Sequence, residues 1–132
     1  MTFEEFIAPA APVASRANLS KVDPSFLYVE GQMEQAKVWM YGCDKYTKIT
    51  GKDARYNWQK LWGNNTVTIC VASILRHTFD IMRGNPRDKE SGLLNAACIK
   101  CNCDMLIKYL YDTGVCTDPF TYDGKIYNEK DK

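Results

Sequence analysis

Apolar residues recur every three or four positions in three long stretches of the chain, which is the spacing of one face of an α-helix. The first stretch predicts a helix from about Pro24 to Tyr46, because Asp23-Pro24-Ser25 is a typical helix start. A polar loop follows over residues 47–57. The aromatic segment Asn57–Trp62 then predicts a single turn packed beneath that loop.

The second stretch predicts a helix from Thr66 to about Met82, with Asn64 or Asn65 as its cap. Its first four residues, Thr-Val-Thr-Ile, are also typical of a strand. We favour the helix because apolar residues continue at helical spacing beyond Leu75.

The third stretch follows the helix-breaking segment Arg83–Asp88. It predicts a helix that begins at Asp88 or Ser91, runs to about Tyr111 and ends at Thr113-Gly114. Its wide apolar surface indicates the central, most buried helix. The three stretches together predict an all-α fold, a small bundle of about three main helices.

The two ends of the chain lack this long periodicity. Residues 1–22 predict an N-terminal arm with one short helix at Phe3–Ile7, and residues 23–113 predict the helical domain. Residues 114–132 form a C-terminal tail, either coil or a β-hairpin over residues 120–127, where Asp123-Gly124 lies between aromatic and β-branched residues.

Composition narrows the possible partners. The 132 residues are enough for one domain, and the net charge of +1 argues against binding to duplex nucleic acid. No apolar run is long enough to span a bilayer, so no membrane partner is expected. Six cysteines without a signal-peptide pattern indicate reduced thiols and a cytoplasmic location, the cytosol of the host cell if a phage encodes the chain.

Polar residues share one face on each predicted helix. The first face contains Glu30, Glu34, Lys37 and Tyr41. The second contains Ser73, His77 and Asp80 beside Arg76, and the third contains Ser91, Asn95, Cys98 and Asn102 after Glu90. If the three faces converge, the bundle holds a polar cleft of the kind that binds ligands and metals.

Each of these signals has a structural alternative. The acidic face of the first helix could be solvated, and a lone histidine such as His77 is more often structural than functional. Asn95 and Asn102 interrupt an apolar helix and need partners, which could be a ligand or neighbouring backbone. In Cys98-x-x-Cys101-x-Cys103 the third thiol points away from the other two on a helix, which disfavours zinc.

Several segments, in order, resemble the phage-type dATP/dGTP diphosphohydrolases, small proteins akin to the MazG-like all-α nucleotide pyrophosphohydrolases. The similarity covers about residues 24–111. The matching segments are Glu34 with Tyr41-Gly42-Cys43-Asp44-Lys45-Tyr46, Asn57-Trp58, Leu75-Arg76-His77, Arg83-Gly84, Asp88-Lys89-Glu90-Ser91-Gly92-Leu93, and Asn102.

The resemblance implies hydrolysis of a deoxynucleoside triphosphate to its monophosphate and pyrophosphate, with Mg²⁺ as cofactor. It implies catalytic roles for Glu34, His77 and Glu90, and metal ligation by Glu34, Asp88 and Glu90. Substrate contacts are expected from Lys45, Asn57, Trp58, Arg76, Arg83, Asn95 and Asn102.

The chain departs from the family pattern at three positions. Met40 replaces an acid, and Asn95 and Cys98 replace two histidines, which leaves the expected metal site partly degenerate. Two alternatives therefore stand beside the enzyme. One is a non-catalytic nucleotide binder, a sensor or sponge of a nucleotide signal, and the other is a small phage adaptor that binds a host protein. Three such apolar helices also predict a homodimer or larger homo-oligomer.

Overall fold

The regular elements of the chain are helices. The computed structural model describes residues 2–7, 21–122 and 124, and no strand is found in these ranges. This confirms the predicted all-α fold. The α-helices are α1 (Phe3–Ile7), α2 (Val29–Thr50), α3 (Thr66–Met82) and α4 (Asn95–Asp112), and short 3-10 turns are η1 (Pro24–Phe26), η2 (Asn57–Lys60) and η3 (Gly63–Asn65).

The chain divides into two units, residues 24–118 and the segments on either side of them. In the latter unit Lys21 forms an antiparallel bridge with Thr121, and the Val22 amide donates to the Phe120 carbonyl at 2.9 Å. The hairpin predicted over residues 120–127 lies largely outside the described residues, because 123 and 125–127 are not among them.

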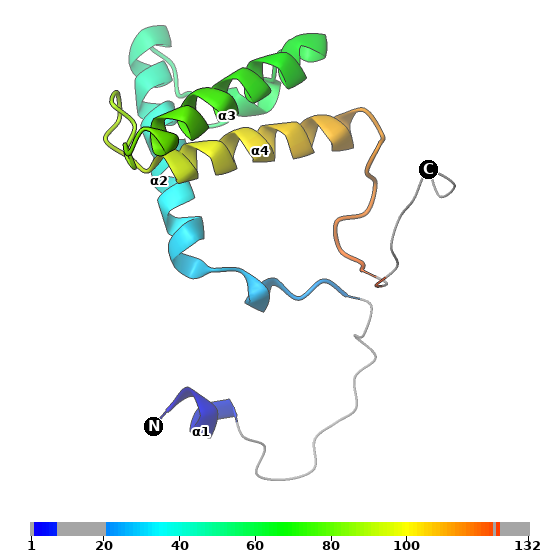
Figure 1. Ribbon diagram of the computed structural model, residues 1–132. Helices are drawn as coiled ribbons and strands as arrows, with labels where there is room; N and C mark the ends of the chain where they lie inside the picture. The colour runs from blue at the N-terminus through cyan, green and yellow to red at the C-terminus, as the bar shows by residue number, and fades with distance from the viewer. Residues whose placement is uncertain (1, 8–20, 123, 125–132) are drawn as a thin grey trace. The chain divides into compact units, whose positions relative to one another are not determined.

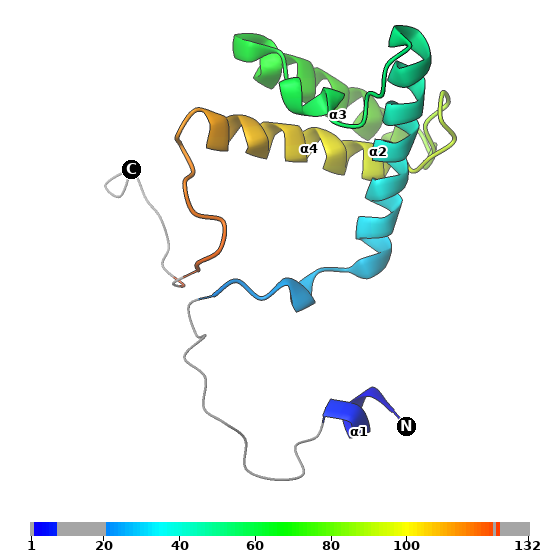
Figure 2. The ribbon, with the colours of Figure 1, turned by 180° about the vertical axis from the view of Figure 1, so that it is seen from behind.

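Helix α4 is the centre of the helical unit. It lies antiparallel beside α3 and also contacts α2, which crosses both helices near the start of α4 (Figures 1 and 2). Of the seven buried residues in the described ranges, four come from α4: Asn95, Ala97, Cys98 and Cys101. The prediction that the third helix is the central one is confirmed.

The contact between α2 and α4 is small and partly polar. Gln35 is only 4% exposed, and its side-chain Nε2 donates to the carboxylate of Asp104 at 2.5 Å. The backbone carbonyl of Gln35 accepts a weak hydrogen bond from the Cys101 thiol at 3.6 Å. Small residues of α4 let the helices approach, and the polar pair fixes their register because a buried amide needs a partner. All six cysteines are free, as the sequence predicts.

The first long helix differs from its predicted bounds at both ends. It was expected over residues 24–46, but Pro24–Phe26 form a separate turn and Tyr28 is extended, so α2 begins at Val29. It continues to Thr50 because Gly51, at φ 71°, adopts the left-handed conformation that ends helices and donates its amide to Thr47.

The third long helix begins later than predicted. Neither Asp88 nor Ser91 starts it, because Asp88 closes a local turn with Ser91 and Gly92 has a positive φ of 73°. The strand-like pair Arg87–Leu94 closes this loop, and α4 starts only at Asn95. The bounds of α3 agree with the prediction, but Asn65 makes no side-chain capping bond.

No helix in the described part of the chain is both long and apolar enough to cross a membrane.

Alanine substitutions at two glycines, one within α2 and one directly after it, should change the stability in opposite directions. Gly51→Ala should lower the free energy of unfolding by about 1 kcal/mol, because an L side chain disfavours φ 71°. Gly42→Ala should raise it by roughly 0.5–1 kcal/mol, because Gly42 is helical and an added Cβ meets no atom within 4 Å. Urea unfolding of both variants measures the two changes, and effects of the same sign would contradict the helix end assigned here.

Candidate functional site

One pocket gathers polar residues from all three long helices. Its volume is about 320 Å³, within the range of small-ligand sites. Polar lining residues come from α2 (Tyr41, Lys45), from the segment after it (Arg55, Asn57), from α3 (His77), from the α3–α4 loop (Asp88, Glu90, Ser91) and from α4 (Asn102). The convergence of the three helices predicted from their polar faces is therefore present, with a partly different set of residues.

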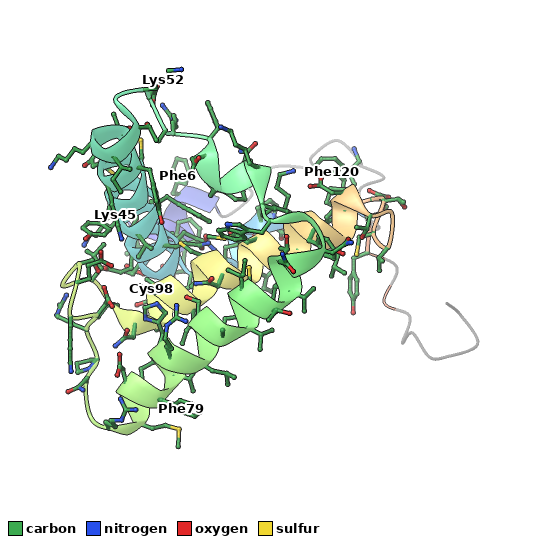
Figure 3. All side chains as sticks on the ribbon, turned by 90° about the horizontal axis from the view of Figure 1, so that it is seen from above. Phe6, Lys45, Lys52, Phe79, Cys98 and Phe120 are labelled. Atoms are coloured by element: carbon green, nitrogen blue, oxygen red, sulfur yellow. The ribbon has the colours of Figure 1, made fainter. Side chains whose placement is uncertain are left out.

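An ion pair links α2 to the α3–α4 loop at this pocket. The ammonium of Lys45 lies 2.6 Å from the carboxylate of Glu90. Figure 3 shows Lys45 on α2, on the side of that loop. The hydrogen bond to Glu90 raises the pKa of Lys45, although the pair is partly exposed. The pair therefore holds the ammonium of Lys45 at the pocket, where a ligand can reach it.

Asp88 is held as a carboxylate by its own turn. Its Oδ2 accepts hydrogen bonds from the amide and the hydroxyl of Ser91, at 2.9 and 2.8 Å. Burial alone would raise the pKa of Asp88, but the bonds from Ser91 and the neighbouring His77 outweigh it, so the pKa is lowered. The pocket therefore contains a fixed negative charge whose orientation is set by local backbone.

His77 reaches the pocket from α3, and its ring has one structural partner. Its Nδ1 lies 2.7 Å from Oδ1 of Asn95, the first residue of α4. Asn95 is fully buried and does not line the pocket. The imidazole is therefore hydrogen-bonded within the bundle, as the structural interpretation expects, and it also lines the pocket, where a functional role stays a prediction.

The remaining wall is aromatic and apolar. Trp39 of α2 and Trp58 of η2 stack with ring centroids 4.5 Å apart and planes inclined by 28°. Two cysteines of α4, Cys98 and Cys101, also line the pocket, and Figure 3 labels Cys98 on that helix. Burial raises the pKa of these two thiols, to about 11 for Cys98 and about 12 for Cys101, so both are neutral and suit packing rather than metal binding.

The sequence was also compared with known proteins. Residues 13–117 match the family model described as dATP/dGTP diphosphohydrolase, N-terminal. The chain belongs to this family. No curated protein and no solved structure matches the chain significantly.

The dATP/dGTP diphosphohydrolase match includes the residues of the pocket. Of the residues that the resemblance suggested, seven line it: Lys45, Asn57, Trp58, His77, Asp88, Glu90 and Asn102. They are far apart in sequence, and α2, η2, α3, the α3–α4 loop and α4 bring them together. Their proposed chemical roles remain predictions.

Three charged residues suggested for the site lie elsewhere. Glu34 pairs with Lys37 at 2.9 Å on α2 and does not line the pocket. Arg83 pairs with Asp80 at 3.0 Å, and Arg76 is exposed on α3. The expectation that Glu34 would share a pocket with His77 and Glu90 is therefore not met, because its turn of α2 lies before the part that lines the pocket.

The two asparagines of α4 differ in position. Asn95 has all its polar groups bonded to protein and does not touch the pocket, so backbone and His77 satisfy it rather than a ligand. Asn102 lines the pocket, and its Nδ2 donates to the Cys98 carbonyl at 2.9 Å. Its Oδ1 is thereby left as a hydrogen-bond acceptor for a ligand. Only Asn102 can contact a molecule in the pocket directly.

Metal ligands in the pocket are sparse. Among the described residues no group of three His, Cys, Asp or Glu side chains is arranged to hold an ion. The pocket itself offers the carboxylates of Asp88 and Glu90. That donor set fits Mg²⁺, which commonly binds through one or two carboxylates together with substrate phosphates rather than in a protein-only cage.

Sequence reasoning missed several lining residues, two of which matter most for binding. Arg55 adds a second cation to the pocket, and Trp39 supplies half of the stacked pair. Arg55 lies two positions before the Asn57-Trp58 pair, which is a signal that could have been used. For Trp39 only the fold of the segment after α2 reveals the stacking partner.

The lowered pKa of Asp88 predicts a pH-dependent contribution to stability. The carboxyl of Asp88 is more acidic in the folded protein than in the unfolded chain. Its contribution to the free energy of unfolding is therefore fully present above pH 3.8, the ordinary pKa, and is lost as the pH falls through the lower pKa of the folded protein. Asp88→Asn should therefore destabilise the protein near pH 7 and much less near pH 2. Urea unfolding across that range measures this difference.

Ser91→Ala is the matched test of the cause. It removes the 2.8 Å hydroxyl bond but keeps the amide bond, so it should reduce the pH-dependent contribution without abolishing it. Equal destabilisation by Asp88→Asn at both pH values would contradict this account of the turn.

Proposed function

We propose that the pocket binds a deoxynucleoside triphosphate, such as dATP or dGTP, and that the chain hydrolyses it to monophosphate and pyrophosphate with Mg²⁺. The observation that carries this proposal is the presence, in one pocket, of a stacked tryptophan pair, two cations and two carboxylates. Membership of the dATP/dGTP diphosphohydrolase family supports the choice of substrate.

The lining of the pocket supplies groups for both the base and the phosphates of such a substrate. The stacked pair Trp39–Trp58 offers an aromatic surface for a base, since base stacking on aromatic side chains is favourable and tolerant of base identity. Lys45 and Arg55 supply cations for phosphate oxygens. Asn57 and Asn102 supply amide groups for the sugar or the edge of the base.

The charge balance of the pocket gives Mg²⁺ a role in binding. Lys45 and Arg55 are matched by Asp88 and Glu90, so the formal charge of these four lining residues is zero. A triphosphate that enters alone therefore meets no net positive charge from these four residues. A divalent ion held by Asp88 and Glu90 would neutralise phosphate charge, and it would supply Lewis-acid activation of the reaction when bound.

The second candidate function is nucleotide binding without turnover. Three residues at which we expect the chain to depart from the family pattern favour it, because none of them can bind a metal ion in the pocket. Asn95 is buried, Cys98 is a neutral thiol, and Met40 does not line the pocket. Glu90 is also already paired with Lys45. Fewer donors are then left to assemble a catalytic metal.

We also propose that a second copy of the chain covers α3. Five apolar residues spaced by three or four positions follow one face of that helix and are 40–75% exposed: Val67, Val71, Leu75, Phe79 and Met82. Figure 3 shows Phe79 on the side of α3 away from α4. The stripe contains no charge, so two copies can pair without repulsion, and the few buried apolar residues of one chain leave a need for more buried surface.

Pyrophosphate release from dATP and dGTP with Mg²⁺ tests the proposed reaction. We expect release by the unmodified chain, and a fall in kcat/KM on the order of 10²-fold or more for His77→Ala and Glu90→Gln. Glu30→Gln changes an exposed acid of α2 outside the pocket and should retain activity.

A thermal-shift series with the same nucleotides, with and without Mg²⁺, separates the two candidates. Stabilisation of about 2.7 kcal/mol at 100 times the dissociation constant without product would favour the binder. If the nucleotides neither stabilise the protein nor yield product, both candidate functions are overturned.

Light scattering on Val71→Lys tests the proposed assembly. Val71 is 40% exposed in the single chain, so a lysine there should be tolerated by the monomer but should dissociate a dimer paired through α3. Ile49→Lys, at a 67% exposed site on α2, is the control and should keep the mass of the unmodified protein. A monomeric unmodified chain at micromolar concentration would refute the dimer.

A further inference from the structure

Asn95 is a buried amide whose every polar group has a protein partner. It is 0% exposed, at the first position of α4. Its backbone amide donates to the Pro86 carbonyl at 2.9 Å, its Nδ2 donates to the Asn85 carbonyl at 2.9 Å, and its Oδ1 lies 2.7 Å from Nδ1 of His77. The side chain is therefore held on two sides and has no freedom to turn.

These contacts determine which atom of the amide faces the histidine. The Asn85 carbonyl can only accept a hydrogen bond, so the NH₂ group of Asn95 must lie against it. The other end of the amide, Oδ1, then faces His77 and can itself only accept. At 2.7 Å this contact requires a hydrogen on Nδ1.

We propose that Asn95 is a positioning residue, which holds His77 in the tautomer protonated at Nδ1 and thereby leaves Nε2 as a proton acceptor in the pocket. His77 lines the pocket, and no hydrogen bond joins its Nε2 to any residue of the described chain. In a neutral imidazole one nitrogen is donor and the other acceptor, so fixing Nδ1–H also fixes the role of Nε2.

The consequence for the reaction rests on the proposed function. Nε2 accepts a proton from water as the water oxygen bonds to the phosphorus of the scissile P–O bond, and the pyrophosphate oxygen leaves with the electron pair of that bond. The resulting imidazolium keeps its Nδ1–H bond to Asn95, and the nearby carboxylate of Asp88 stabilises its charge. The opposite tautomer would present N–H to the water and could not accept this proton.

A neutral amide suits this role better than a carboxylate would. The Oδ1 of Asn95 orients the ring without adding a third negative charge to those of Asp88 and Glu90. Asn95 also ties the histidine to the turn after α3 through two carbonyls, so the loop and the ring are set by one residue.

NMR of the nucleotide-free protein tests the tautomer directly. His77 is the only histidine of the chain, so its ring nitrogens need no assignment by mutagenesis. We expect long-range ¹H–¹⁵N spectra at about pH 9, where free imidazole is neutral, to show a protonated Nδ1 and an unprotonated Nε2. A protonated Nε2 would overturn the proposal. The measurement uses no substrate, so its outcome is independent of whether the chain hydrolyses nucleotides.

Two variants separate positioning from packing. Asn95→Ala should move both nitrogen signals toward the values of rapidly exchanging tautomers and lower kcat on the order of tenfold or more, with KM changed much less. Asn85→Ala keeps the backbone carbonyl and should leave the spectrum unchanged. An unchanged spectrum in Asn95→Ala would overturn the role assigned to Asn95, and if this variant fails to fold, the spectrum of the unmodified protein still decides the tautomer.

Discussion

The attachment of Asn95 to the loop before it organises this fold. The chain reverses between α3 and α4, and Asn95 closes that reversal with bonds to the carbonyls of Asn85 and Pro86. The same residue bonds His77 one helix away. Because a fully buried amide is costly when unpaired, this arrangement strongly favours one loop conformation. The acids Asp88 and Glu90 lie within that loop and take their places from it.

The second wall of the pocket depends on a different kind of contact. Helix α2 meets α4 through Gln35 and Cys101, and it meets the loop through the ion pair between Lys45 and Glu90. The latter pair is partly exposed, so it contributes little to stability, yet it places a cation and an acid at the mouth of the pocket. The polar contacts thus position functional groups, while few apolar side chains are buried in the single chain.

Asn95 and Cys98, where the resemblance led us to expect histidines, contribute unequally to the pocket. Cys98 is a buried neutral thiol, so it contributes packing and little else to the pocket. Asn95 retains hydrogen-bonding capacity and uses it on His77. The site of this dATP/dGTP diphosphohydrolase family member is therefore built on two carboxylates, one imidazole and two cations, a set that suits an ion arriving with its phosphates.

The sequence by itself was sufficient for the all-α class, the three long helices, the central position of α4 and the family, because these follow from local apolar periodicity and ordered motifs. Helical spacing placed His77 and Asn102 on polar faces, and the family resemblance added Lys45; all three line the pocket. Only the tertiary structure removed Glu34, added Arg55 and Trp39, and assigned Asn95 to His77. Those outcomes depend on how the segment between α2 and α3 packs on α2, and on how the α3–α4 loop with its turn at Asp88 folds. Helical periodicity contains no information about contacts between segments distant in sequence.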